Sequence, residues 1–248
     1  MLKVENLKKS FGGILATDNL TFEVETGEIH ALIGPNGAGK TSLIGQITGE
    51  IKQDSGKIIF DEIDISDLPI HTRSAIGLAR SFQITNIFKE MTTLDNVALA
   101  IQARSGHSFC FWNNARKNPQ LRNPASMFLQ QVGLEKRADI TAGELSHGEH
   151  RQLEISMALA TNPKILLLDE PMAGMGAEES KSMVEILQKL KNKLTILLVE
   201  HDMNVVFALA DKITVLVYGK VIATGSPKQI RNNAKVQAAY LGEMNQNA

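Results

Sequence analysis

The sequence predicts an α/β fold built around a mainly parallel sheet. Three short apolar runs, at 164–169, 195–200 and 212–217, have the length and composition of strands buried on both faces. Amphipathic segments at about 178–191 and 203–210 separate them, and an alternation of strands with helices indicates parallel crossovers. We therefore expect a sheet that is covered by helices on both faces.

The N-terminal third predicts strands of two kinds. Residues 2–7 and 20–25 alternate apolar with polar side chains, as half-buried antiparallel strands do. Residues 30–34 form a continuous apolar run that ends in glycine, so we expect a strand buried on both faces, followed by a helix over Lys40–Thr48. Two later segments predict a strand or hairpin and then a strand that leads into a loop, at 58–66 and 78–83.

The middle of the chain has a different pattern. Residues 94–103 and 126–134 have helical spacing, and the stretch between them has no clean period. This part of the chain therefore predicts a mostly helical subdomain that carries an irregular insert. Buried strands return after it, and the chain has no internal repeat.

The composition narrows the class of protein. A chain of 248 residues, 43% of them hydrophobic, has room for one large domain or for a core with a subdomain. The net charge of −1 lacks the basic excess typical of nucleic-acid binding. The longest apolar runs fall far short of the ~20 residues that span a bilayer. We expect a cytoplasmic protein with no nucleic acid as partner, which would act at a membrane only by docking to another protein.

Residues 34–41, GPNGAGKT, match the phosphate-loop pattern G-x-x-x-x-G-K-[ST] at every fixed position. Glycines let backbone N–H groups curl around phosphates, and the following helix adds its positive dipole end. Lys40 would reach the β- and γ-phosphates of ATP or GTP, and the Thr41 hydroxyl would bind Mg²⁺. A glycine-rich turn without a ligand is the plainer alternative. The nucleotide-binding residues expected here are Gly34, Pro35, Asn36, Gly37, Ala38, Gly39, Lys40, Thr41 and Ser42.

Two acidic residues follow the buried run ILLL. Asp169 and Glu170 come at the carboxyl end of this predicted strand, which is where open α/β sheets bind ligands. We expect Asp169 to hold Mg²⁺ through its water shell, and Glu170 to orient or deprotonate an attacking water. A strand that simply runs into an acidic turn before Pro171 is the alternative.

Residues 145–160, LSHGEHRQLEISMALA, resemble the LSGGQ signature of ATP-binding-cassette (ABC) proteins and precede the acidic strand as they do in that family. Ser146 and Glu149 also form an S-x-x-E capping box, so a well-capped helix is the plainer interpretation. The resemblance implies more. It implies that Ser146 and the Gly148 N–H face the γ-phosphate of an ATP molecule held by a partner subunit.

Further residues match the family in its order along the chain. The resemblance implies that Phe11, which precedes two glycines, stacks on adenine. It implies that Gln83 in RSFQ touches Mg²⁺ and the attacking water, and that His201 in LLVEHDM contacts the γ-phosphate. The implied catalytic residues are thus Glu170, His201 and Gln83, and the implied metal-binding residues are Thr41, Gln83 and Asp169.

The chain departs from the family pattern at two places. His147 and Glu149 stand where glycine and glutamine are usual, and a carboxylate at position 149 would repel a nearby γ-phosphate. After Pro171, residues 172–176 read MAGMG instead of SALD. Gly176 therefore replaces the aspartate that helps to couple two ATP sites.

The resemblance covers residues 2–242 and implies the ABC ATPase fold in one domain. That fold has a P-loop NTPase core, RecA-like, at about 1–90 and 160–230, with an antiparallel β subdomain. A helical subdomain with the signature motif is implied at about 91–160, and a short helical tail at about 227–248. The implied active form is a dimer, of two copies or of one copy and a similar chain, that sandwiches two Mg-ATP.

Residues 80–100, the insert after them, and AAYLGE at 238–243 resemble the ATPase subunits of branched-chain amino-acid importers. This resemblance implies separate permease subunits, an extracytoplasmic substrate-binding protein, and a peripheral place on the cytoplasmic face of the membrane. An importer of another amino acid or urea, a lipopolysaccharide-type exporter, a soluble cassette ATPase and a P-loop kinase are the alternatives. Three aromatic residues of the insert would either dock to the permease or form a local core: Phe109, Phe111 and Trp112.

Overall fold

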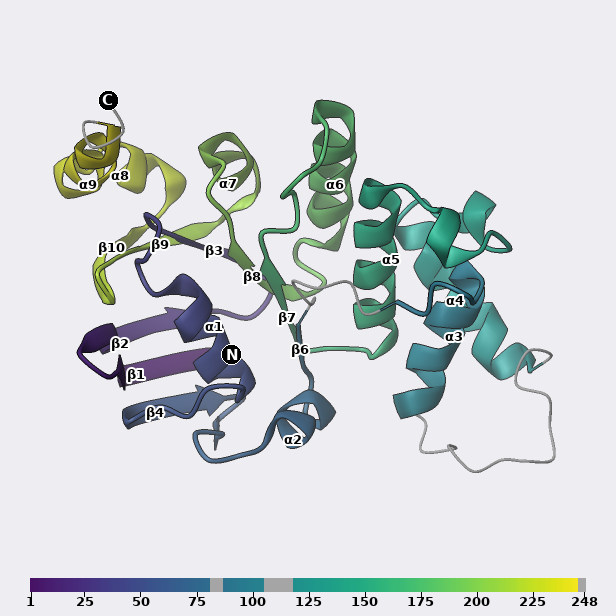
Figure 1. The fold of residues 1–248 in the computed structure, drawn as a ribbon, viewed down its shortest axis with the longest axis horizontal. Helices are drawn as coiled ribbons and strands as arrows, with labels where there is room; N and C mark the ends of the chain where they lie inside the picture. The colour runs from purple at the N-terminus through teal and green to yellow at the C-terminus, as the bar shows by residue number, and fades with distance from the viewer. Residues whose placement is uncertain (81–86, 105–117, 245–248) are drawn as a thin grey trace.

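The computed structural model describes residues 1–80, 87–104 and 118–244, and it has two sheets with helices around them (Figure 1). The strands are β1 (Leu2–Phe11), β2 (Ile14–Val24), β3 (Ile29–Ile33), β4 (Ser55–Phe60), β5 (Ile63–Asp64), β6 (Leu78–Arg80), β7 (Ile165–Asp169), β8 (Thr195–Val199), β9 (Lys212–Val217) and β10 (Lys220–Gly225). The helices are α1 (Lys40–Thr48), α2 (Ile70–Ala75), α3 (Thr93–Arg104), α4 (Pro119–Gln131), α5 (His147–Ala160), α6 (Ala177–Leu190), α7 (Met203–Leu209), α8 (Pro227–Arg231) and α9 (Ala234–Met244).

The larger sheet has the strand order β10-β9-β3-β8-β7-β6. All pairs from β9 to β6 are parallel, and β10 is antiparallel at one edge. Every residue of β3, β7 and β8 is buried, which explains their continuous apolar runs. The α/β prediction and the mainly parallel sheet are therefore confirmed, whereas the edge strand β10 was not predicted.

The smaller sheet is antiparallel, with the order β2-β1-β4-β5. Its strands alternate buried with exposed residues, as the sequence predicts for β1 and β2. The segment 58–66 is a hairpin, because Phe60 pairs with Ile63 across a two-residue turn. Both turn residues, Asp61 and Glu62, have a positive φ, as this kind of tight turn requires.

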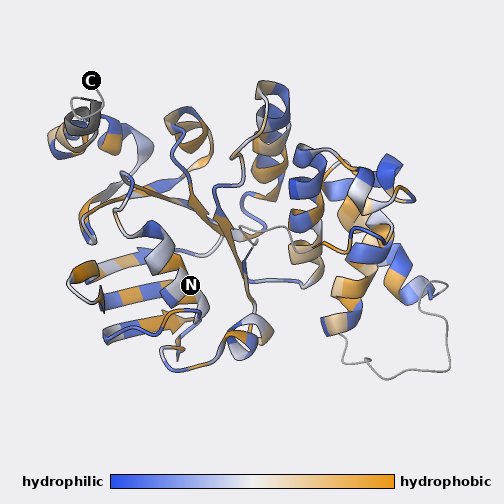
Figure 2. Cartoon of the chain, viewed as in Figure 1, coloured by the Kyte–Doolittle hydropathy of each residue, from blue (hydrophilic) through white to orange (hydrophobic). Residues whose placement is uncertain are grey.

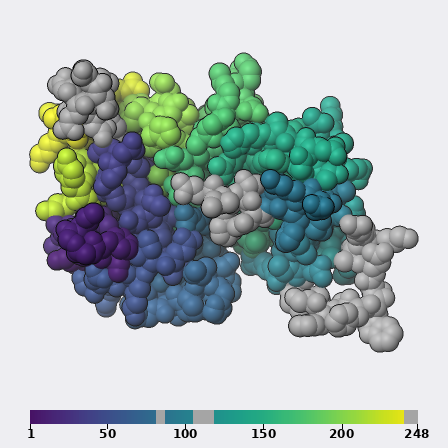
Figure 3. All heavy atoms as spheres, viewed as in Figure 1, coloured from purple at the N-terminus to yellow at the C-terminus, as the bar shows by residue number. Residues whose placement is uncertain are grey.

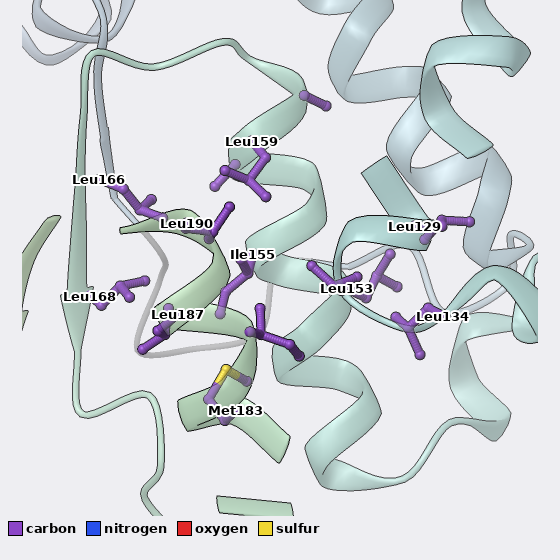
Figure 4. Close-up of a cluster of buried hydrophobic side chains, with 14 of the residues drawn as sticks. Leu129, Leu134, Leu153, Ile155, Leu159, Leu166, Leu168, Met183, Leu187 and Leu190 are labelled. Atoms are coloured by element: carbon purple, nitrogen blue, oxygen red, sulfur yellow. The ribbon is translucent and has the colours of Figure 1, made fainter. Parts of the chain in front are cut away.

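Helices α3, α4 and α5 pack against one another at the end of the molecule away from the smaller sheet (Figures 1 and 3). Apolar side chains of α5 connect this group to the larger sheet. Leu153, Ile155 and Leu159 belong to one buried cluster with Leu166 of β7 and Leu187 of α6 (Figure 4). The helical part and the sheet therefore share a continuous core.

The helix α4 starts seven residues before the predicted helical segment at 126–134. Pro119 is its first residue, and the Asn118 side chain accepts a hydrogen bond from the backbone N–H of Gln120. An Asn-Pro pair is a helix-start signal, and here it identifies the true boundary. Hydrophobic residues line the strands at the centre of the molecule (Figure 2), and within the described ranges no helix is long and apolar enough to cross a membrane.

The buried Arg73 of α2 caps the carboxyl end of α1. Its guanidinium donates hydrogen bonds to the carbonyl oxygens of Gln46 and Ile47 at 2.7 and 2.8 Å, and to those of Ser66 and Leu68 at 2.9 and 2.8 Å. Carbonyls in the last turn of a helix have no partner within the helix, and a cation there also matches the dipole. Burial lowers the pKa of Arg73, and the nearby Asp67 opposes this effect.

We predict that Arg73→Lys lowers the free energy of unfolding by about 3 kcal/mol, because an ammonium cannot serve several carbonyl groups in the planar geometry of the guanidinium. Urea denaturation followed by circular dichroism measures this change. Lys52→Ala is the matched control, since Lys52 forms an exposed ion pair with Asp67, and it should leave the midpoint unchanged. An Arg73→Lys chain as stable as the wild type would contradict the capping role.

Candidate functional site

The loop at 34–41 connects β3 to α1 and is held tightly against β2 and β9. Gly39 is the N-cap of α1 and has a left-handed conformation with a φ of 98°. A Cβ atom on Gly39 would lie 2.2 Å from the carbonyl oxygen of Ala16, and one on Gly34 would lie 2.3 Å from that of Leu216. Both positions therefore require glycine, since a side chain would push the loop off its supports.

The Lys40 side chain folds back onto this loop. Its ammonium donates hydrogen bonds to the carbonyl oxygens of Gly34 at 2.6 Å and Pro35 at 2.9 Å, and the residue is buried. The positive charge is thus held at the N-terminal end of α1, where the helix dipole is also positive. Thr41 is exposed and Ser42 is half-buried. The loop offers a cation, backbone N–H groups and hydroxyls, which together suit a polyphosphate.

Asp169 ends β7 and is buried beside Arg80 from the neighbouring strand β6. Arg80 donates one hydrogen bond to Asp169 Oδ2 at 3.1 Å and another to Glu50 Oε2 at 2.6 Å. Burial raises the pKa of Asp169, while the charge and hydrogen bond of Arg80 act in the opposite direction. The charge of Lys40 also acts on this carboxyl, so the loop and the end of β7 belong to one electrostatic site. Sequence reasoning missed Arg80, because a single arginine at the end of a strand is no distinctive signal.

Glu170 follows Asp169 and lies near His201. Its backbone N–H donates to the carbonyl oxygen of Val199 at 2.9 Å, which ties it to the end of β8. His201 comes two residues after Val199, and its Nδ1 lies 3.6 Å from Glu170 Oε1. Glu170 has a φ of 49°, a left-handed conformation that is costly for a residue with a side chain. Parallel pairing of β7 with β8 therefore brings together two residues that are far apart in the sequence.

The signature segment starts α5 as the capping box predicts. Ser146 is the N-cap, and its Oγ accepts a hydrogen bond from the Glu149 N–H at 3.2 Å. The Glu149 carboxylate accepts from the Ser146 N–H at 2.9 Å and from Arg137 Nε at 2.7 Å. Partial burial acts to raise the pKa of Glu149, but these two donors outweigh it and hold the pKa below its usual value. Its charge is therefore already compensated within the chain.

A second carboxylate at this helix end was not predicted. Glu179 of α6 accepts hydrogen bonds from Ser146 Oγ at 3.3 Å and from the Gly176 N–H at 3.2 Å. A Cβ atom on Gly148 would lie 2.7 Å from this carboxylate, so a side chain there would displace Glu179 from its present position. Glu179 thus connects the loop that lacks the usual aspartate to the signature helix. The sequence signal was a glutamate three residues after Gly176, which is the spacing of a capping box.

Two other predicted site residues have different outcomes. Phe11 is 47% exposed at the end of β1. It pairs with Ile14 at the start of β2, two residues before Ala16, whose carbonyl contacts Gly39. An exposed aromatic ring therefore lies on the hairpin that supports the phosphate loop. Gln83 and the aromatic residues of the insert lie outside the described residues.

The fold and this site define an ATP-binding cassette. Residues 17–173 match the family model described as ABC transporter, and the chain belongs to this family and is an ATPase that binds ATP. Its C-terminal segment, residues 220–244, matches a second model, described as branched-chain amino acid ATP-binding cassette transporter.

Comparisons with known proteins agree with this assignment. The chain is similar to the high-affinity branched-chain amino acid transport ATP-binding protein LivG of Escherichia coli K12, with 39% identity over 98% of each chain. It is 34% identical to the lipopolysaccharide export system ATP-binding protein LptB of Haemophilus influenzae, again over 98% of each chain.

Solved structures of cassettes show the same fold. The ADP conformation of the cassette MJ1267 superposes with a TM-score of 0.85 at 33% identity, and 98% of each chain is covered. A dimeric structure of the cassette MJ0796, in a post-hydrolysis state with ADP and Pi, has a TM-score of 0.77 at 27% identity. That similarity covers 92% of this chain and 99% of the other. The predicted ABC ATPase fold is therefore confirmed.

We predict that two glycine variants of the phosphate loop differ in stability without nucleotide. Gly37→Ala should lower the free energy of unfolding by about 1 kcal/mol, since its φ is 77° but no atom lies near the added methyl group. Gly39→Ala should lower it by about 3 kcal/mol or more, because the methyl group also collides with the Ala16 carbonyl. Chemical denaturation of the two chains tests this order. Equal losses would mean that the loop does not depend on the contact with β2.

Proposed function

We propose that this ATPase is the energy-supplying subunit of an importer of branched-chain amino acids, acting on separate permease subunits. The match of residues 220–244 to the branched-chain family carries this proposal, and the full-length similarity to LivG supports it. The substrate itself would be bound by other chains, so this subunit recognises the permease rather than the amino acid.

In the proposed site, the loop at 34–41 holds the phosphates of ATP. Lys40 would leave the carbonyl groups of Gly34 and Pro35 and donate to the β- and γ-phosphates instead. The close packing of Gly34 and Gly39 supports this role, because it keeps backbone N–H groups facing the phosphates. Phe11 would stack on the adenine ring from the neighbouring hairpin.

The same site suits Mg²⁺, which prefers oxygen ligands and is usually held by one or two carboxylates together with phosphates. Thr41 would provide its exposed hydroxyl, and Asp169 would act through a water molecule. Arg80 and Lys40 support an ionised Asp169, because both lower its pKa against the effect of burial. The metal would supply neutralisation of the charge on the transferred phosphoryl group. Gln83 is proposed as a further ligand from its sequence position.

For hydrolysis, we assign the attacking water to Glu170, which would orient it and accept its proton. His201 would contact the γ-phosphate, and its 3.6 Å approach to Glu170 supports a shared role at that end of the nucleotide. Parallel alignment of β3, β7 and β8 supports this arrangement, because the phosphate loop, Glu170 and His201 all follow the carboxyl ends of these strands.

We also propose that two subunits form a head-to-tail dimer around two ATP molecules. Ser146 and the Gly148 N–H of one subunit would complete the site of the other, as helix N-termini commonly bind anions. The dimeric MJ0796 structure supports such an assembly. Pairing of Glu149 with Arg137 supports it as well, since the compensated carboxylate repels a γ-phosphate less.

The permease is proposed to dock at a cavity of about 230 Å³ that is lined by residues of α2, β6, α3 and α5. Apolar side chains of α2, β6, α3 and α5 line this cavity, among them Ile70, Leu78, Ala100 and Met157. Arg80 lines it too and donates to Asp169, which provides a physical connection from the permease to the ATP site. The subunit would then lie on the cytoplasmic face of the membrane.

We predict that Glu170→Gln retains ATP binding but loses turnover by about 10²–10⁴-fold, because a carboxamide cannot accept a proton from water. Phosphate release and the affinity for a fluorescent ATP analogue measure the two effects. Lys40→Ala is the companion variant and should lose the affinity as well. Turnover near the wild-type rate in the Glu170→Gln chain would contradict the assignment of the water to this residue.

Purification from membranes tests the proposed transport role. A tagged Glu170→Gln chain, which should favour the ATP-bound complex, is expected to co-purify with permease subunits of the branched-chain type, identified by mass spectrometry. The similarity to LptB makes a lipopolysaccharide-type exporter the second candidate. Recovery of export permeases, or of no membrane protein at all, would contradict the importer.

A further inference from the structure

Glu200 is a buried carboxylate at the carboxyl end of β8. It is 1% exposed and lies between Val199, the last residue of the strand, and His201. Its Oε1 accepts a hydrogen bond from the Met172 N–H at 3.1 Å, and its Oε2 accepts one from the His201 N–H at 3.1 Å. A buried carboxylate without such donors would be strongly unfavourable, so these contacts decide whether it can remain charged.

These two hydrogen bonds connect the loops that carry Glu170 and His201. Residues 170–173 form a tight turn, closed by the Ala173 N–H donating to the Glu170 carbonyl at 3.1 Å, and Met172 lies inside it. The start of the turn is tied to Val199 by the Glu170 N–H. Glu200 provides a second attachment in the middle of the turn, from the same strand end. Without it, the Glu170 N–H bond to β8 and the packing of Met172 in the core would still hold the turn, but the Met172 N–H would lose its acceptor.

The chemistry of the contacts requires a carboxylate of this length. Both facing groups are N–H donors, so the side chain must offer two acceptor oxygens. A glutamine has the same shape, but its NH₂ group would face one of the donors. Burial raises the pKa of Glu200, and the backbone N–H groups of Met172, His201 and Asp202 oppose this rise. Donors thus surround the carboxylate and favour its ionised form.

We propose that Glu200 is a positioning residue for hydrolysis, which holds the turn at 170–173 so that Glu170 faces the γ-phosphate beside His201. This inference rests on the roles of Glu170 and His201 in the proposed function. Glu200 would act through the two loops and through the His201 ring, whose Nδ1 lies 3.9 Å from Glu200 Oε2. Its loss should therefore slow the chemical step while leaving ATP binding intact, because the phosphate loop belongs to β3 and α1.

The test is the kinetics of Glu200→Gln in the purified full-length chain. We expect kcat to fall by about tenfold or more, as small displacements of a catalytic group commonly cause, while KM for ATP stays within about twofold. In a Glu170→Gln background the same substitution should have a much smaller effect, because the side chain that Glu200 would position can no longer accept a proton, and residues that act through one another are not additive. An unchanged kcat, or equal effects in the two backgrounds, would overturn the proposal.

Glu28→Gln is the matched control. Glu28 is also a largely buried carboxylate, and it accepts a hydrogen bond from the backbone N–H of Glu25 at 2.8 Å. It lies just before the amino end of β3, whereas the candidate site lies at the carboxyl ends of the strands. It should leave kcat unchanged. Glu200→Asp, which keeps the charge and shortens the reach, serves as a second variant if the glutamine chain does not fold. Loss of kcat and ATP affinity together in both would overturn the proposal in favour of a role in folding.

The outcomes separate this inference from the proposed function. If Glu170→Gln retains turnover, the assignment of the hydrolytic water fails, and the role of Glu200 fails with it. If Glu170→Gln loses turnover while Glu200→Gln behaves as wild type, only the positioning role of Glu200 fails.

Discussion

Parallel pairing of β3, β8 and β7 is the constraint on which the candidate site depends. Each strand is five residues long and fully buried, so its backbone groups must bond to the neighbouring strands. Because the strands run in one direction, the three segments that follow them meet at one edge of the sheet. Lys40, Asp169, Glu170 and His201 lie together there for that reason.

Arginine side chains balance two carboxylates of the candidate site, one at the end of β7 and one at the start of α5. Asp169 is buried with Arg80, and Glu149 at the start of α5 is paired with Arg137. Each carboxylate has a cation from another segment, so neither is left uncompensated where phosphate is proposed to bind. The core shared by α5, α6 and β7 connects these two regions mechanically, since well-packed interiors transmit displacements.

Much of this arrangement could be predicted from the sequence, because local patterns determine it. Continuous apolar runs predicted β3, β7 and β8, and the glycines and Lys40 predicted the loop before α1. The sequence did not reveal Arg73, Arg80 or Glu200, since their roles depend on burial against segments far away in the chain. A polar residue outside a motif looks the same whether it is solvated or bonded to four carbonyl groups. The strand β10 was missed because its local signal is weak, and the start of α4 because Pro124 interrupts the helical pattern that follows the Asn-Pro start signal.

The conformation of Glu170 has a consequence for selection. A positive φ disfavours any residue with a side chain, by about 1 kcal/mol or more relative to glycine. If Glu170 activates the water as proposed, a screen for thermal stability alone would enrich glycine at position 170 and recover more stable chains that have lost hydrolysis. Selection for hydrolysis and selection for stability would then favour different residues at position 170. Under the proposed function, the carboxylate of Glu170 is needed for hydrolysis in spite of the cost of this conformation.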